Sequence, residues 1–190
     1  MFKTILKYVA PSLIIMISGT WLVTSGFWPF SSKGIDQFAK CRRSTISGVV
    51  GSIGGPFTLI DERGAAVTDQ DVITEPSLIY FGYTFCPDVC PLDTVRNVEV
   101  VEILAQAGTS ATPIFITIDP QRDTPEVMAE YSQLIHQKMI GLTGSQAQVK
   151  AASKAYRTYY KSHADQDEEF YLVDHSTITY LVLPEHGFVD

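Results

Sequence analysis

Two cysteines separated by three residues, Cys86 and Cys90, are the residues with the most distinctive chemistry in this sequence. Thiolates act as nucleophiles, redox partners and soft metal ligands. Pro91 suits the first position of a helix, and a residue that precedes proline is disfavoured in the helical region, so we predict that Cys90 is a helix N-cap. A thiol there would feel the positive end of the helix dipole, which predicts a lowered pKa and a reactive thiolate.

The spacing of the two cysteines is compatible with two chemistries. Thioredoxin-like redox motifs have two residues between their cysteines, whereas this pair has three. A disulfide requires Cα atoms about 4.4 to 6.8 Å apart, which a tight turn can supply, and the same sulfurs suit a single Cu(I) ion. Two buried, inert cysteines are the third alternative, but two prolines and Asp88 make the segment a poor core strand or helix.

His175 is the residue that distinguishes metal binding from thiol chemistry. A single histidine is more often a hydrogen-bonded core or surface residue than a ligand. Two thiolates and one imidazole, however, are a soft ligand set that suits copper, and Cu(I) accepts three ligands. Zinc is the competing metal, but structural zinc sites normally have four protein ligands. We assign His136, His163 and His186 to structural or surface positions.

The cysteine pair is expected to lie between a strand and a helix. Residues 78–81 form a continuous apolar run, which indicates a strand buried on both faces, and Gly82 lets the backbone leave it. Apolar residues at helical spacing predict a helix from Pro91 to a stop at Gly108. A second buried strand, residues 113–118, completes a βαβ unit.

The other elements are predicted from turn and cap signals. A hairpin of residues 56–60 and 65–67 precedes the unit, with Gly64 where its turn requires a positive φ. Thr124 begins a helix that ends near His136, and a capping box at Ser145 begins another that ends near Lys161. The remaining predicted segments are a strand at 139–142, a mobile acidic loop at 165–169, strands at 170–173 and 177–183, a turn at 184–187 and a strand starting at Phe188.

A stripe of basic residues follows one side of the helix that begins after Ser145. It comprises Lys150, Lys154, Arg157 and Lys161. Such a stripe is usually a solvated helix face, and we interpret it so, with partner docking as the alternative.

This order of elements predicts an α/β fold, a thioredoxin-like α/β sandwich with an N-terminal β-hairpin, over residues 56–190. Ordinary thioredoxins place a cis-proline opposite their cysteines, whereas this chain has no proline between residues 126 and 183 and offers His175 there. In this topology the loop at His175 returns to the sheet edge that carries the cysteines. No helical sequence follows Phe188, so we expect the domain to lack a C-terminal helix and to expose apolar side chains there.

The N-terminal residues predict a membrane anchor. Residues 8–30 contain no charged side chain and are long enough to cross a bilayer core of about 30 Å. We therefore predict one transmembrane helix in residues 1–30 and a juxtamembrane linker in residues 31–55. A cleaved signal peptide is the alternative, but no small-residue cleavage site is evident. Basic residues on both sides leave the orientation open, and the short N-terminal tail suggests a bacterial inner-membrane protein.

The charge distribution argues against a nucleic-acid-binding protein. The chain has a net charge of −7, and residues 1–40 carry four Lys and one Asp, so the rest of the chain accounts for −10. Nucleic-acid binding requires clustered basic charge instead. Three cysteines are too few for a disulfide scaffold, and we interpret the third, Cys41, as incidental.

The sequence closely resembles the Sco/SenC family of copper-site assembly proteins. The resemblance covers about residues 55–190 and is most specific in residues 80–91, 117–125, 142–144 and 173–177. It implies that Cys86, Cys90 and His175 bind one copper ion, as Cu(I) or Cu(II). It further implies that Asp119 supports this site from outside the ligand set. Family members usually continue into a last helix after the final strand, whereas this chain stops at Asp190.

The resemblance also implies a cellular role. The protein would help to build the dinuclear copper centre of cytochrome c oxidase, with the copper-containing oxidase subunit as its partner. Its domain would face the periplasm, where it would meet a copper donor or a thiol reductant.

Two functions use the same cysteines. The first is a copper metallochaperone, which binds and transfers a metal without turning over a small substrate. The second is a membrane-anchored thiol-disulfide oxidoreductase or redox sensor that acts through Cys86 and Cys90. We favour the metallochaperone, and the two functions differ in whether His175 is required.

Overall fold

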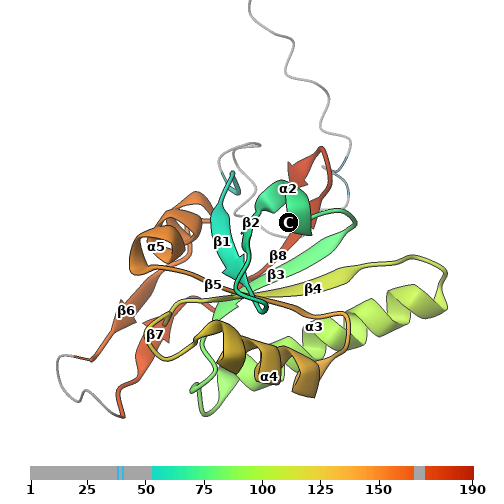
Figure 1. Ribbon diagram of the computed structural model, residues 1–190. Coiled ribbons are helices and arrows are strands. Elements are labelled where there is room, and N and C mark those ends of the chain that lie inside the picture. Colours follow the sequence, from blue (N-terminus) through green and yellow to red (C-terminus); the bar gives the residue numbers. More distant parts are fainter. Residues whose placement is uncertain (1–37, 39, 41–52, 165–169) are drawn as a thin grey trace, which may run out of the picture. The chain divides into compact units, whose positions relative to one another are not determined.

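The structure is a computed structural model of the chain, and it describes Phe38, Lys40 and residues 53–164 and 170–190 (Figure 1). The predicted anchor, residues 1–30, lies outside the described residues, as do most of the predicted linker, Cys41 and the acidic loop 165–169. In the described part of the chain, no helix is both long and apolar enough to cross a membrane.

A mixed sheet of seven strands forms the centre of the described domain, in the order β2-β1-β5-β4-β3-β8-β9, and β6 and β7 form a separate two-stranded sheet. The strands are β1 (Thr58–Asp61), β2 (Ala66–Thr68), β3 (Ser77–Gly82), β4 (Thr112–Thr117), β5 (Ile140–Thr143), β6 (Tyr160–Ser162), β7 (Val173–His175), β8 (Thr179–Leu183) and β9 (Gly187–Phe188). The helices are α2 (Asp69–Val72), α3 (Val89–Gln106), α4 (Pro125–Ile135) and α5 (Gln146–Ala155).

The sheet topology brings three loops to one edge. Strands β3 and β4 are parallel, so the loops that follow Gly82 and Thr117 leave from the same end of the sheet. Strand β8 is antiparallel to β3, and its first residue, Thr179, pairs with Tyr80. The segment that enters β8, which carries His175, therefore arrives at the edge where the cysteine loop begins.

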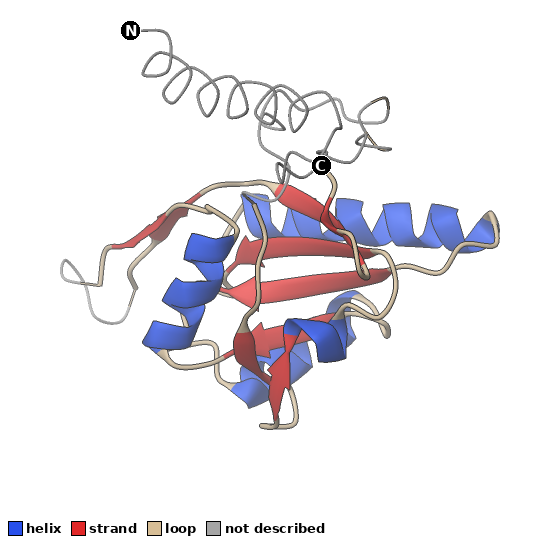
Figure 2. Cartoon of the chain, turned by 90° about the horizontal axis from the view of Figure 1, so that it is seen from above, coloured by secondary structure: helices blue, strands red, loops and turns tan. Residues whose placement is uncertain are grey.

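Helices cover both faces of the sheet. Helices α3 and α4 pack against each other and against β3, β4 and β5, whereas α5 packs near β1. Figure 1 shows α3 and α4 below the sheet and α5 above it. Figure 2 shows the same layers from above. Strand β4 is buried along its whole length because both its faces are covered. On the α5 side, the ring of Tyr156 lies 5.5 Å from that of Phe81 and 5.3 Å from that of Tyr180.

Most of the predicted elements are confirmed. Strands β1 and β2 form the expected antiparallel hairpin, with Gly64 at a φ of 78°. The side chain of Thr124 caps α4, and Ser145 with Gln148 forms the capping box of α5. Gly82 allows close packing at the end of β3, because a Cβ there would lie 2.9 Å from the ring of Phe115.

The predicted end of the α5 helix is wrong. The helix ends at Ala155, and Arg157 adopts a left-handed conformation with a φ of 54°, which reverses the chain. Lys161 consequently lies in strand β6 and not on the helix. The strand predicted at residues 170–173 begins instead at Val173, and helix α2 was not predicted.

Strands β6 and β7 form an arm beside the main sheet, which projects clearly from the domain in Figures 1 and 2. Three residue pairs hold the two strands together, and the pair nearest the domain is Tyr160 with His175. His175 therefore lies at the base of this arm.

Candidate metal centre

The structure brings together the three residues that the sequence singled out. Donor atoms of Cys86, Cys90 and His175 all lie within 4.8 Å of one another. Two metal–ligand bonds of about 2.0 to 2.3 Å span at most about 4.6 Å, so a small movement would let all three atoms bind one ion. The sulfurs come from the loop after β3 and from the start of α3, whereas the imidazole comes from the end of β7.

The two cysteines differ in their surroundings. Cys86 is half-buried in the loop, while Cys90 is completely buried in the first turn of α3. The backbone N–H of Cys90 donates to the sulfur of Cys86 across 3.5 Å, so a helix-terminal N–H points at the more exposed sulfur.

Two predictions about Cys90 are corrected. The helix begins at Val89, and its N-cap is Asp88 and not Cys90. Burial raises the pKa of the Cys90 thiol, aided by its hydrogen bond with Cys86, whereas the helix dipole predicted a lowered pKa. Removing a sulfur from water disfavours its charged form, and the depth of Cys90 in the core is not visible in the local sequence.

His175 is held with one ring nitrogen directed toward the sulfurs. Its Nε2 atom lies 3.2 Å from the sulfur of Cys90, and its Nδ1 atom lies 2.9 Å from the carbonyl oxygen of Ser176. A carbonyl can only accept, so Nδ1 carries the proton, and Nε2 keeps a lone pair for a metal. The rings of Tyr80 and Tyr83 contact the imidazole edge-on at 6.2 and 5.9 Å.

Asp119 lies behind the site and does not belong to the ligand cluster. Its carboxylate accepts hydrogen bonds from Arg122 Nε at 2.5 Å and from the hydroxyl of Tyr171 at 2.6 Å. Arg122 also stacks on Tyr171, with 3.6 Å from Cζ to the ring centroid, and lies 4.7 Å from the ring of Phe85. Asp119 and Arg122 thus join the residue before Cys86 to the segment that leads into His175.

A second buried acid fixes the cysteine loop. Asp123 accepts hydrogen bonds from the N–H of Thr84 at 3.1 Å, from the hydroxyl of Thr84 at 2.6 Å and from the hydroxyl of Thr117 at 2.5 Å. Arg122 and Asp123 were not among the predicted site residues, although both lie in the family-like segment 117–125. Their position after β4, whose end lies beside the end of β3, was the signal that could have identified them.

Asp123 predicts a specific pH dependence of stability. Burial raises the pKa of this carboxyl above its ordinary value of 3.8, so the folded state binds its proton more tightly than the unfolded state. Protonation of Asp123 therefore contributes to the stability of the fold. This stabilisation is fully present below pH 3.8 and is lost as the pH rises through the folded-state pKa. In urea titrations, we expect wild-type stability to fall relative to Asp123→Asn over that range. Parallel pH profiles of the two proteins would contradict this expectation.

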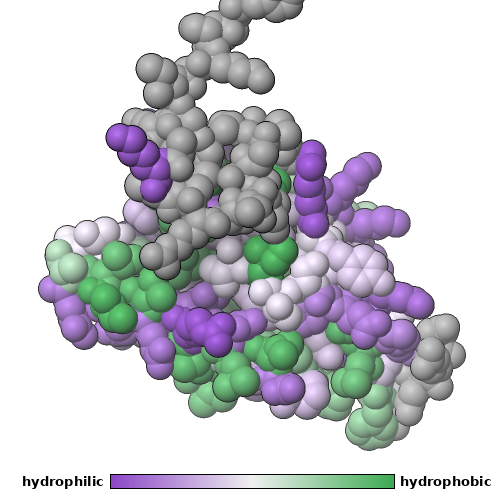
Figure 3. All heavy atoms as spheres, turned by 180° about the vertical axis from the view of Figure 1, so that it is seen from behind, coloured by the Kyte–Doolittle hydropathy of each residue, from purple (hydrophilic) through white to green (hydrophobic). Residues whose placement is uncertain are grey.

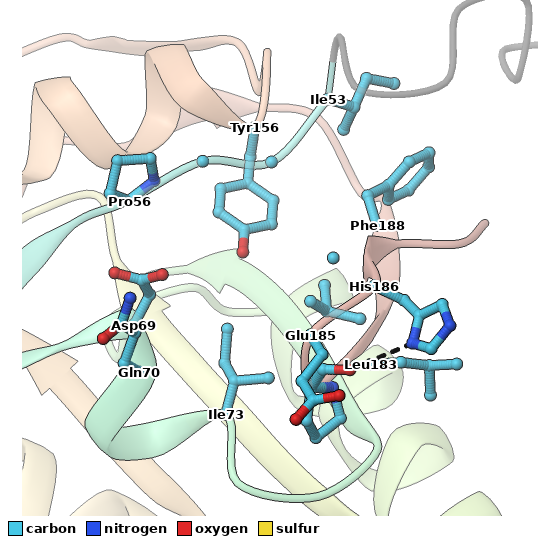
Figure 4. Close-up of a pocket in the computed structure, with 15 residues that line it drawn as sticks. Ile53, Pro56, Asp69, Gln70, Ile73, Tyr156, Leu183, Glu185, His186 and Phe188 are labelled. Atoms are coloured by element: carbon cyan, nitrogen blue, oxygen red, sulfur yellow. Dashed lines mark hydrogen bonds between the residues drawn. The ribbon is translucent and has the colours of Figure 1, made fainter. Parts of the chain in front are cut away.

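The other histidines occupy the structural or surface positions expected for them. His136 bonds to Glu102 at 2.7 Å, and His163 bonds to Asp174 at 2.8 Å. His186 lies beside a cavity of about 420 Å³ near β8 and β9, which Asp69, Tyr156 and Phe188 also line (Figure 4). None of the three candidate ligands lines this cavity.

The absence of a C-terminal helix was expected to expose apolar side chains beside the last strands. No large hydrophobic side chain of β8 or β9 is among the strongly exposed ones in the described residues. Leu181 and Leu183 of β8 are half-buried. The absence of a closing helix stays a prediction.

Comparison with known proteins finds similar sequences. The protein SenC of Rhodobacter capsulatus is 56% identical over 155 residues, which cover 82% of this chain and 69% of SenC. The chain covers only 41 to 64% of several other curated relatives, which are mitochondrial and rickettsial SCO proteins.

Solved structures of similar proteins share the fold. The copper-bound ScoI structures from Arabidopsis thaliana and Bradyrhizobium japonicum match with TM-scores of 0.67 and 0.66 and identities of 41% and 39%. Each match covers 73% of this chain, and 85% and 87% of the two ScoI chains. The predicted thioredoxin-like α/β fold is therefore confirmed. A family model described as SCO1/SenC matches residues 48–190, and the chain belongs to this family.

Proposed function

We propose that this protein is a copper metallochaperone that binds one copper ion through Cys86, Cys90 and His175. The observation that carries the proposal is the convergence of two sulfurs and one correctly oriented imidazole nitrogen from three separate segments. Such a donor set suits Cu(I), and similar ScoI proteins have been solved with copper bound.

The recipient we propose is the dinuclear copper centre of cytochrome c oxidase, reached through its copper-containing subunit. Family membership supports this proposal. Cys86 is the more exposed cysteine, so we propose that a recipient ligand first reaches copper on that side, while Cys90 and His175 still hold it. A copper donor or a thiol reductant in the periplasm would reload the site.

We further propose that residues 1–30 anchor the protein in a bacterial inner membrane, with the domain in the periplasm. The uncharged stretch of residues 8–30 supports the anchor. Fusing a reporter enzyme that is active only in the periplasm to the C-terminus would test the orientation, and an inactive reporter would contradict it.

Metal analysis of the reduced domain, residues 53–190, tests the copper site directly. We expect one copper ion per chain, and X-ray absorption should show two sulfur ligands and one nitrogen ligand. Single alanine variants of the three residues should each weaken binding. Full copper affinity in all three variants would refute the site, and exclusive zinc binding would refute the metal.

The alternative, a thiol-disulfide oxidoreductase or redox sensor, rests on the closeness of the two sulfurs, which would allow a disulfide. Such a protein would oxidise Cys86 and Cys90 while reducing a partner disulfide, or the reverse. It would not require an imidazole nitrogen aimed at the sulfurs, which is the reason we place it second.

We propose that Asp119 is a positioning residue for this site. Asp119→Ala removes the acceptor that holds both Arg122 and Tyr171, so His175 should be less well fixed. Outer hydrogen-bond partners of metal ligands typically change affinity about 10- to 100-fold, and we expect a copper affinity loss in this range with an unchanged ligand set in X-ray absorption. Unchanged affinity in a folded Asp119→Ala variant would contradict the proposal.

A further inference from the structure

A groove at the end of α5 is lined by three basic side chains. Lys150 and Lys154 lie one turn apart on the exposed side of α5, and Arg157 follows the helix end; all three line one groove of about 610 Å³. Tyr159 and Tyr160 also line it. In Figure 3, which shows the molecule from behind, hydrophilic side chains project from the side that carries α5 and the β6–β7 arm.

These cations have no carboxylate partner in the described part of the chain. Of the four arginines there, Arg63, Arg96 and Arg122 each pair with an aspartate, whereas Arg157 forms no such pair. Lys150 and Lys154 form none either within the described residues. Because the chain is acidic overall, with a net charge of −7, a groove with three unpaired cations is a marked local exception.

The backbone at Arg157 is unusual for this residue type. Its φ of 54° is the left-handed conformation in which helices commonly end with glycine. An arginine is strained there, and such strain tends to persist where the side chain has a function. The turn directs the chain from α5 into Thr158, Tyr159 and then β6.

The groove is joined to the metal centre through Ser176. The N–H of Ser176 donates to the carbonyl of Tyr159 at 2.9 Å, and its hydroxyl accepts from the N–H of Tyr159 at 3.1 Å. The carbonyl of the same Ser176 holds the imidazole of His175. Tyr159, which lines the groove, is therefore hydrogen-bonded to the residue whose carbonyl orients a proposed copper ligand.

From these observations we propose that the groove docks an acidic segment of the protein that exchanges copper with this domain. This inference rests on the proposed copper function for the identity of the partner. Charge complementarity selects an acidic occupant, and the hydrogen bonds between Tyr159 and Ser176 connect the groove with the residue whose carbonyl orients His175. Docking of this kind would bring the partner to the segment that holds His175.

Binding of a hexaglutamate peptide to the copper-free, reduced full-length protein tests the groove, with NMR amide shifts as the readout. At low salt, we expect shifts in residues 154–160 and at Ser176, and an affinity that falls as salt rises. Arg157→Gly should lower this affinity by about tenfold, and glycine fits the left-handed backbone, so the fold is kept. Lys138→Ala removes one charge outside the groove, where its amine bonds to Ser110, and should have little effect.

Three outcomes would overturn the proposal. Equal losses in Arg157→Gly and Lys138→Ala would show only general attraction between charges. Equal affinity for inorganic phosphate and hexaglutamate would make the groove a small-anion site. Normal oxidase assembly at limiting copper in cells that carry only Arg157→Gly would show that the groove is not needed to bind the protein that exchanges copper.

The copper function is tested separately. Arg157→Gly should still bind one copper ion, whereas Cys86→Ser should lose copper and keep hexaglutamate binding. A failure of the docking proposal and a failure of the copper proposal are thus distinguishable.

Discussion

Replacing His175 with alanine should lower copper affinity by about a hundredfold or more while the Cys86–Cys90 pair still forms a disulfide. The change removes the nitrogen that lies 3.2 Å from the Cys90 sulfur and leaves both thiols in place. The loss should exceed that caused by altering an outer hydrogen-bond partner, because a direct ligand is removed. Copper competition titrations and a redox titration of the thiols measure the two properties on the same protein.

The same variant separates the two candidate functions in cells. A copper chaperone with His175→Ala should fail to support cytochrome c oxidase assembly at limiting copper, whereas a thiol oxidoreductase should still support it. His136→Ala is the matched control, because His136 bonds to Glu102 and does not belong to the ligand cluster. Normal assembly with His175→Ala, together with loss of assembly with Cys86→Ser, would replace the chaperone proposal with thiol exchange.

In the reduced, metal-free protein, iodoacetamide should modify Cys86 at least about a hundredfold faster than Cys90. Alkylation requires an accessible thiolate. Cys90 is completely buried and its pKa is raised by burial, whereas Cys86 is half-buried at the loop surface. Peptide mapping by mass spectrometry after short reaction times gives both rates.

Copper loading provides the control for this experiment, since bound metal should protect both cysteines together. Faster modification of Cys90 would mean that the helix dipole, and not burial, governs its reactivity. Denatured protein should lose the difference, because both thiols then become equally accessible.

The closeness of Cys86, Cys90 and His175 could be predicted from the sequence because the relevant signals are local or topological. Cys86 and Cys90 follow a continuous apolar strand, and a βαβ unit places the loops after β3 and β4 at one edge. His175 could be placed at the same edge because the segment after it enters a strand next to β3. These rules need only the order and direction of the elements.

Features that depend on packing could not be predicted in this way. The depth of Cys90 depends on side chains of several elements, so the dipole argument assigned the wrong direction to its pKa shift. The stacking of Arg122 on Tyr171 joins residues 49 positions apart, and no local pattern announces it. The left-handed turn at Arg157 occurs without the glycine that would have marked the helix end.

The β6–β7 arm gives the three ligands unequal mechanical support. Cys86 follows a strand of the seven-stranded sheet and Cys90 lies in α3, whereas His175 belongs to a two-stranded sheet held by three residue pairs. Isolated two-stranded sheets are only marginally stable, so the arm depends on Tyr83, which accepts a hydrogen bond from Val173, and on the Arg122 stack. Amide exchange should accordingly be faster in the arm than in β3 and β4. Local opening there could withdraw one ligand on a timescale far shorter than that of unfolding, which would separate the lifetime of the copper complex from the lifetime of the fold.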